Sequence, residues 1–150
     1  MTTIENRGPK IAEADVVRFE ASLGSPLPAE YREFLLMSNG GVPTPDTIDI
    51  PEFSESPTDV QVLFGVGRSV ESSRLEWNLT TLADRLGADL LPIACDSGGN
   101  TFCLSLRPDD IGAVLYCDLQ AVFAESESSP ECYYVAPSFE SFLERLRPFS

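Results

Sequence analysis

The sequence predicts a single α+β domain spanning residues 1–150, with a mostly antiparallel sheet of about four to six strands. Helical patterns occur twice before residue 42, once near the middle and once at the C-terminus, whereas strand-like runs lie mainly in residues 90–136. Turn residues join these runs in place of crossover helices, which favours antiparallel pairing. A chain of 150 residues buries roughly 70% of its unfolded surface, so its core needs neither a metal nor a disulfide.

The N-terminal part predicts a helical hairpin that follows a polar tail at residues 1–10. Apolar residues repeat at helical spacing from Ala12 to Leu23, and Gly24 ends the pattern. Pro28 suits the first turn of a second helix, because its missing N–H would be unpaired there. This second helix ends at Ser38-Asn39-Gly40-Gly41, which is typical of a C-cap.

The segment after this hairpin is rich in Pro, Asp, Glu, Ser and Thr. Residues 42–59 therefore predict a long exposed loop with one short strand near Ile48–Ile50. The apolar run Val60–Phe64 predicts a further strand, and Gly65-Val66-Gly67 ends it.

A third helix is predicted in the middle of the chain. Ser73 and Glu76 have the spacing of a capping box at its start, and Gly87 ends it. The leucines of its predicted buried face are Leu75, Leu79, Leu82 and Leu86. Trp77 lies off this face and is either the edge of the core or a partner contact.

Two apolar runs, Leu90–Cys95 and Thr101–Leu106, predict a hairpin at the centre of the sheet. The second run alternates in the manner of a half-buried strand. The residues between the runs tolerate positive φ or bond to their own backbone. We therefore expect structural turn roles for Asp96, Gly98, Gly99 and Asn100.

The C-terminal part predicts two more strands and a closing helix. Arg107–Gly112 predicts a turn, and Ala113–Cys117 and Cys132–Ala136 predict the strands. Residues 118–130 are acidic and serine-rich, which predicts a mobile connection. Ser138 is the expected N-cap of the last helix.

Catalytic and metal-binding residues are not expected. The chain has no histidine, which excludes Ser-His-Asp and Cys-His nucleophiles and an imidazole base. Its four cysteines are widely spaced in apolar runs, which favours buried small hydrophobic residues over metal ligands or disulfides. Gly65-Val66-Gly67 lacks the third glycine of a dinucleotide-binding motif, since Val70 stands there, and is interpreted as a turn. We therefore expect no metal and no cofactor.

The negative charge of the chain argues against nucleic acid and anionic membranes as partners. Asp and Glu outnumber Lys and Arg by 24 to 10, which gives a formal charge of -14. Such a surface repels nucleic acid and anionic membranes and attracts basic partners. The alternative explanation is that the negative charge only keeps the protein soluble. The N-terminus lacks the apolar segment of a secretory signal, and no apolar run approaches membrane-spanning length. These features favour a cytoplasmic location.

Two acidic zones are candidate partner-binding faces, with a solvated loop as the alternative for each. No Lys or Arg occurs between Arg32 and Arg68, or between Arg107 and Arg145. The candidate contacts are Asp46, Asp49, Glu52, Glu55 and Asp59 in the first zone, Asp109, Asp110, Asp118, Glu125 and Glu127 in the second, and Trp77.

Several motifs occur in a specific order along the chain. They are Leu27-Pro28-Ala29-Glu30-Tyr31 with Asn39-Gly40-Gly41, then Leu91-Pro92-Ile93-Ala94 with Asp96 and Gly98-Gly99-Asn100, then Gly112 with residues 114–118, and finally Ser138-Phe139 with Phe142-Leu143. Together they resemble the SUKH superfamily, which contains yeast cell-wall-assembly regulators and many bacterial immunity proteins. The resemblance spans nearly the whole chain, although residues 118–130 have no clear counterpart in it.

The resemblance implies an α+β domain that binds proteins and has no catalysis of its own. Bacterial members typically neutralise a toxin encoded beside them, often a nuclease or a nucleic-acid-modifying enzyme. The first hypothesis is therefore an immunity protein, a monomer or weak dimer, that binds the basic surface of a cognate toxin. The alternatives are an adaptor of the cell-wall-regulator type and a small-molecule-binding module that uses Gly65–Ser69 and Asp96.

Overall fold

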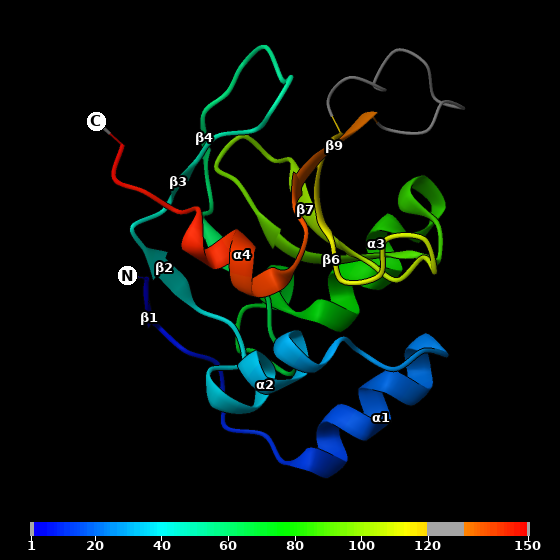
Figure 1. Cartoon of the computed structure of the whole chain (residues 1–150). Helices are drawn as coiled ribbons and strands as arrows, with labels where there is room; N and C mark the ends of the chain where they lie inside the picture. Colours follow the sequence, from blue (N-terminus) through cyan, green and yellow to red (C-terminus); the bar gives the residue numbers. More distant parts are fainter. Residues whose placement is uncertain (1, 120–130, 150) are drawn as a thin grey trace.

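The centre of the structure is a five-stranded antiparallel sheet with the strand order β5-β6-β7-β8-β9 (Figure 1). The computed structural model describes residues 2–119 and 131–149. The five strands are β5 (Val62–Leu63), β6 (Leu90–Cys95), β7 (Thr101–Ser105), β8 (Val114–Asp118) and β9 (Glu131–Ala136). The predicted hairpin is β6–β7, and it lies inside the sheet with a neighbour on each side.

Within residues 2–119 and 131–149, four helices and two small strand pairs complete the α+β fold that the sequence predicted. The helices are α1 (Glu13–Leu23), α2 (Ala29–Met37), α3 (Leu75–Leu86), which follows a 3-10 turn at Glu71–Ser73, and α4 (Phe139–Glu144). The strand pairs are β1 (Thr3–Glu5) with β2 (Val42–Thr44) and β3 (Thr47–Ile48) with β4 (Thr58–Asp59), both antiparallel.

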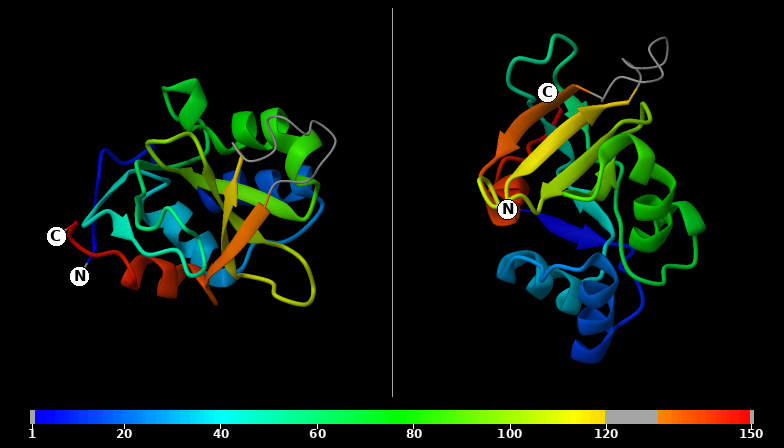
Figure 2. Two further views of the ribbon diagram at one scale, coloured as in Figure 1. Left: turned by 90° about the horizontal axis from the view of Figure 1, so that it is seen from above. Right: turned by 90° about the vertical axis from the view of Figure 1, so that its right-hand side faces the viewer.

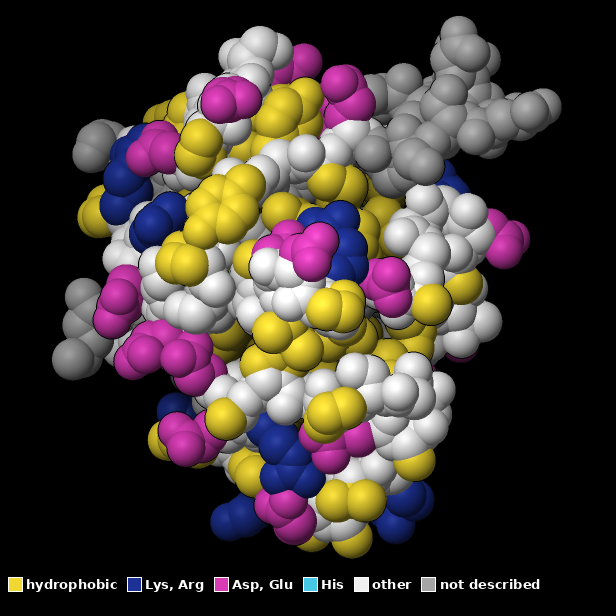
Figure 3. All heavy atoms as spheres, turned by 45° about the vertical axis from the view of Figure 1, so that its right-hand side comes forward, with side chains coloured by type: hydrophobic (Ala, Val, Ile, Leu, Met, Phe, Trp, Pro, Cys, Tyr) yellow, Lys and Arg dark blue, Asp and Glu magenta, His cyan; other side chains and the backbone are white. Residues whose placement is uncertain are grey.

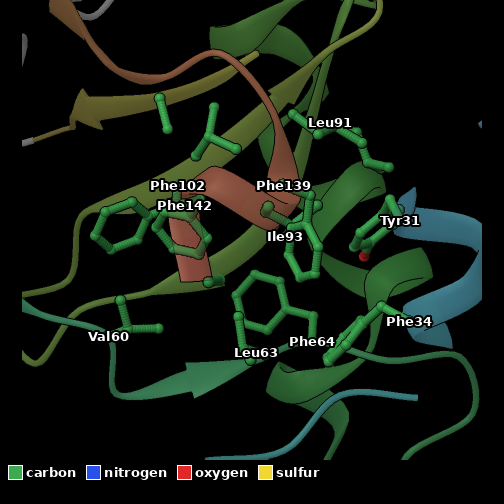
Figure 4. Close-up of a cluster of buried hydrophobic side chains, with 14 of the residues drawn as sticks. Tyr31, Phe34, Val60, Leu63, Phe64, Leu91, Ile93, Phe102, Phe139 and Phe142 are labelled. Atoms are coloured by element: carbon green, nitrogen blue, oxygen red, sulfur yellow. The ribbon is translucent and has the colours of Figure 1, made fainter. Parts of the chain in front are cut away.

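The main core lies between the sheet and helices α2 and α4, and a series of aromatic rings in contact runs through it (Figure 4). The ring of Phe139 lies 5.0 Å from that of Tyr31 and 4.8 Å from that of Phe34. The ring of Phe142 in turn lies 5.3 Å from that of Phe102 on β7. The closing helix therefore connects the N-terminal hairpin to the sheet, and full burial of each such side chain contributes about 1.5–3 kcal/mol.

A second, smaller cluster covers the other face of the sheet. It consists of Leu90, Cys103, Leu115 and Cys117, and Leu86 of α3 packs against it. Figure 2 shows α3 and α4 on opposite sides of the sheet. Every residue of β7 is consequently buried, so the prediction of a half-buried strand is wrong.

The polar tail and the 42–59 segment are more ordered than the composition indicated. Thr3 pairs with Thr44 in a β1–β2 register that ties the N-terminus to the segment that follows α2. Ile48, Ile50 and Val60 are each at most 2% exposed. The composition did not indicate these elements, because the segment is mostly polar and its buried apolar residues are isolated from one another in the sequence.

The predicted caps of α3 and α4 have different outcomes. Ser138 is confirmed as the N-cap of α4, since its Oγ accepts a 3.1 Å hydrogen bond from the Ser141 amide. The Ser73 capping box is wrong. Ser73 ends the 3-10 turn, Arg74 occupies the cap position of α3, and the Glu76 carboxylate accepts the amide of Gly67.

The buried face of α3 is narrower than its leucine pattern predicted. Leu75 is buried, but Leu79, Leu82 and Leu86 are only half-buried. The side chain of Asn78 is buried as well, and its amide donates to the carbonyls of Ser72 and Arg74. The hydrogen bond from Asn78 to Ser72 therefore joins α3 to the 3-10 turn before it through a polar contact and not an apolar one.

The prediction that all cysteines are reduced core residues is wrong for one pair. Cys117 and Cys132 lie opposite each other in the β8–β9 register, with Cα atoms 4.1 Å apart, and they form a disulfide. Widely spaced cysteines become partners because the antiparallel register brings them together. Cys95 and Cys103 are free, and Cys103 is fully buried.

Candidate functional site

The turn between β6 and β7 contains a buried carboxylate. Asp96 is 4% exposed, and its Oδ1 accepts hydrogen bonds from the amides of Gly98 (3.0 Å) and Asn100 (2.8 Å). Gly99 has φ of 93°, which a side chain would strain. The Asp96 side chain therefore organises the turn by accepting hydrogen bonds from the backbone amides of the turn.

The same carboxylate connects this turn to two other segments. Its Oδ2 accepts hydrogen bonds from Thr58 Oγ1 (2.7 Å) and from the hydroxyl of Tyr116 (2.5 Å). Asn100 donates from its side chain to the Tyr116 hydroxyl, and its Oδ1 accepts the amide of Leu119. The turn, the 46–59 loop and the end of β8 are thus joined by one buried polar network.

The acidic loop between β3 and β4 is fixed to the sheet through Phe53. The Phe53 ring lies 5.2 Å from the ring of Tyr116 and 5.1 Å from that of Tyr133. Within the loop, Ser56 Oγ accepts the amide of Ile50 at 2.8 Å. The sequence analysis did not predict that Phe53 fixes the loop to the sheet. The signal that could have identified it is a single aromatic residue in an acidic loop.

Members of the first acidic zone differ in their partners. Asp46, Glu52 and Glu55 are exposed, and among the described residues none of the three has an ion pair. Asp49 forms a 2.8 Å ion pair with Arg147, whose hydrogen bond lowers the pKa of that carboxyl. Asp59 accepts the amide of Ser97 at 2.9 Å.

The second acidic zone is divided between the two ends of the sheet. Asp109 and Asp110 lie in the β7–β8 turn, and Asp118 lies at the far end of β8. Asp110 forms a 2.7 Å ion pair with Arg107, and the hydrogen bond from this guanidinium lowers the pKa of Asp110. Glu125 and Glu127 lie outside the described residues.

One group of carboxylates from both zones lies at the same end of the molecule. Asp118 and Glu131 stand opposite each other in the β8–β9 register. The loop that carries Glu52 and Glu55 lies beside this end of β8–β9, at the top of Figure 1 and of the right-hand view of Figure 2. We call this group, Glu52, Glu55, Asp118 and Glu131, the acidic end.

The electrostatics of the acidic end fit a cationic contact. Burial raises the pKa of the neighbouring Tyr133, and the charges of Glu131 and Asp118 raise it further. Figure 3 shows several Asp and Glu side chains toward the top of the face that it presents. Grouped carboxylates on a fixed scaffold attract basic protein surfaces and repel phosphate backbones.

Trp77 is 37% exposed on α3, which lies on the opposite side of the sheet from α4 (Figure 2). It is therefore accessible at the surface.

The glycine turn after β5 has a packing role. A Cβ on Gly65 would stand 2.1 Å from the carbonyl oxygen of Asn39. The Asn39 side chain itself bonds the backbone of Val66 through both its oxygen and its nitrogen. A hollow lined by Gly67, Arg68 and Ser69 does not include Asp96, whose carboxylate is occupied by four donors.

The described part of the chain contains neither a group of metal-ligating side chains nor a membrane-spanning helix. Within residues 2–119 and 131–149, no three His, Cys, Asp or Glu side chains are grouped in the way a metal ion requires. None of the helices described there combines the length and the apolar character needed to span a bilayer.

Comparison with known proteins relates this chain to a described family and to a bacterial protein. Residues 10–145 match the family model described as SMI1/KNR4 family (SUKH-1). The chain is also 28% identical over 141 residues to a Bacillus subtilis (strain 168) protein described as SPbeta prophage-derived uncharacterized protein YokK. That alignment covers 85% of this chain and 70% of the relative.

The matched range contains every motif on which the sequence resemblance rested, from Leu27 to Leu143. It also contains the whole five-stranded sheet and the α1–α2 hairpin. The wider superfamily includes toxin immunity proteins. The chain therefore belongs to the SMI1/KNR4 family (SUKH-1).

Proposed function

We propose that this protein is an immunity protein that neutralises a toxin by binding it through the acidic end, with no chemical step of its own. The observation that supports this most directly is the fixed position of the acidic loop. Phe53 and Thr58 fasten the loop to Tyr116 and Asp96, while Glu52 and Glu55 remain exposed. A loop held in this way loses little backbone freedom when its exposed carboxylates bind a partner.

The chemistry of the partner follows from the charge of this surface. A toxin that cuts or modifies nucleic acid grips phosphate with Lys and Arg, so its site is cationic. The acidic end would be steered toward such a site and would compete there with the substrate. A cytoplasmic protein that is a monomer or a weak dimer fits this role, because the nucleic acid to be protected is inside the cell.

The test uses the product of the gene adjacent to this one. We expect a complex with Kd in the nanomolar range or below, and an association rate that falls as salt is raised. The charge-reversal variant Glu52→Lys/Glu55→Lys should weaken the complex at least about 100-fold and abolish protection of cells.

A matched variant controls for net charge. Glu71→Lys/Asp84→Lys changes the charge by the same amount at exposed positions on the α3 side. It should leave affinity within about threefold of the unaltered protein. If both double variants weaken binding equally, or if only the α3 variant does, the acidic end is not the toxin contact. Binding of several unrelated proteins would instead favour an adaptor.

A further inference from the structure

A groove separate from the acidic end lies between β1, α2 and α4. It has a volume of about 490 Å³, within the range of sites that hold ligand or peptide side chains. A continuation of about 380 Å³ shares Thr2, Glu140 and Leu143 with it. Helix α2 lies at the opposite end of the molecule from the 49–57 loop (Figures 1 and 2).

The floor of the groove is apolar. Phe34 and Phe139, which belong to the main hydrophobic core, line the groove together with Leu143, which is half-buried. At the margin, the side chain of Met37 is 72% exposed. An exposed methionine next to an aromatic floor is a flexible apolar contact that adapts to the shape of a partner.

Carboxylates form the rim of this groove. Glu30 and Glu33 of α2 and Glu140 of α4 line the groove, and Glu144, also of α4, lines the 380 Å³ hollow that continues it. Among the described residues none of these four has an ion pair, and Arg7 is the single cation that lines the groove. The Glu30 carboxylate also accepts the amide of Glu140 at 3.2 Å, which holds the two helices in place.

We propose that this groove binds a lysine- or arginine-rich segment of a protein partner that inserts a large apolar side chain between the glutamates. The apolar floor supplies the anchor pocket and the four carboxylates supply the matching charge. Nucleic acid and anionic lipid are repelled by the same rim. The inference does not depend on the acidic end, because the two surfaces share no residue.

The test uses a defined probe and the whole protein. The probe is an amphipathic peptide of about 14 residues with lysine on one face and leucine on the other, and its lysine-to-glutamate counterpart is the control. Amide chemical shifts of the isotope-labelled protein should move at Glu30, Glu33, Phe34, Met37 and Leu143 with the basic peptide alone.

Two variants make the test specific. Met37→Lys adds a cation to the rim at an exposed position and should weaken the peptide at least about tenfold, or 1.4 kcal/mol. Val17→Lys, at a 50% exposed position on α1, should leave its affinity unchanged. Glu52→Lys/Glu55→Lys should also leave it unchanged, which separates this inference from the proposed toxin contact.

Shifts confined to the groove, lost in Met37→Lys and kept in Val17→Lys, support the proposal. Shifts centred on the acidic end would overturn it, and so would equal binding of the acidic peptide or an affinity that Met37→Lys does not change. Neither result would decide whether the acidic end binds a toxin, because that experiment uses a different partner and different variants.

Discussion

The Tyr116 hydroxyl donates a 2.5 Å hydrogen bond to Asp96 Oδ2 and accepts one of 2.9 Å from Asn100 Nδ2. It therefore uses both its donor and its acceptor capacity inside the core, where Tyr116 is 1% exposed. Because Thr58 bonds the same carboxylate oxygen, this hydroxyl couples the sheet to the acidic loop. The buried tyrosine of α2, Tyr31, contrasts with it, since its hydroxyl has no hydrogen-bond partner among the described residues.

The two tyrosines give a matched pair for the first prediction. Tyr116→Phe should lower the free energy of unfolding by about 1–3 kcal/mol, because it leaves a donor and a charged acceptor without their partner. Tyr31→Phe should leave stability unchanged or raise it by about 1 kcal/mol, because it removes a buried hydroxyl that is unsatisfied. Urea denaturation of both variants measures the difference. Equal losses would mean that the hydrogen-bonded hydroxyl of Tyr116 contributes no more to stability than the unpaired hydroxyl of Tyr31.

The second prediction concerns alkaline pH. Burial raises the pKa of Tyr31 and of Tyr116, and for Tyr116 the hydrogen bond to Asp96 raises it further. Burial likewise raises the pKa of the Cys95 thiol to about 11. A group whose pKa is raised by folding stabilises the protein below its unfolded pKa, and this contribution is lost as the pH rises toward the folded value.

Stability should therefore begin to fall above about pH 8.5, the ordinary thiol value, and fall more steeply above about pH 10, the ordinary tyrosine value. Circular dichroism records unfolding, and absorbance at the tyrosinate band records ionisation. The buried tyrosines should ionise together with unfolding and not before it. Full tyrosine ionisation in a protein that keeps its native spectrum would contradict the burial-based argument.

The third prediction tests the Cys117–Cys132 bridge. It closes a loop with a sequence separation of 15 residues, and loop-closure entropy for such a loop corresponds to about 3 kcal/mol. Protein purified under air and denatured should show two reactive thiols, those of Cys95 and Cys103. Cys132→Ser should lower the free energy of unfolding by a similar amount to reduction of the unaltered protein.

Cys95→Ser is the control for this experiment, because Cys95 is free and half-buried. Its stability should still fall when a reductant is added, since the bridge remains in it. Four reactive thiols in the unreduced protein, or a Cys132→Ser variant that still responds to reductant, would show that the bridge does not form.

The sequence predicted those parts of the fold that depend on near neighbours. The β6–β7 hairpin follows from alternating apolar residues around a turn-forming Asp96–Asn100 segment, and the start of α4 follows from Ser138. The chain order of the SUKH motifs added the arrangement of these pieces. Local signals of this kind are complete within about a dozen residues.

The missed features depend on residues that are distant along the chain. β1 exists because Thr3 meets Thr44, and the disulfide exists because the β8–β9 register places Cys117 opposite Cys132. Neither register is encoded in spacing alone. The positions of the acidic residues also could not be read from their spacing. Asp109 and Asp118 are close in sequence, but β8 separates them and they lie at its opposite ends.

The fourth prediction separates the charge of the acidic loop from its fixed position. Phe53→Ala removes the ring that packs on Tyr116 and Tyr133 but keeps all the loop carboxylates. If prior ordering of Glu52 and Glu55 contributes to toxin affinity, the variant should bind about tenfold more weakly, because loop ordering then has to accompany binding. The loss should appear in the dissociation rate, while the association rate and its salt dependence, which report long-range charge, should stay near those of the unaltered protein.

Global stability of Phe53→Ala should fall by no more than about 2 kcal/mol, since Phe53 is only half-buried and lies at the margin of the core. Glu52→Lys/Glu55→Lys should show the opposite pattern, with a slower association rate, so the two variants together distinguish ordering from attraction. An unchanged affinity for Phe53→Ala would mean that charge alone carries the contact and that the aromatic anchor serves only the fold.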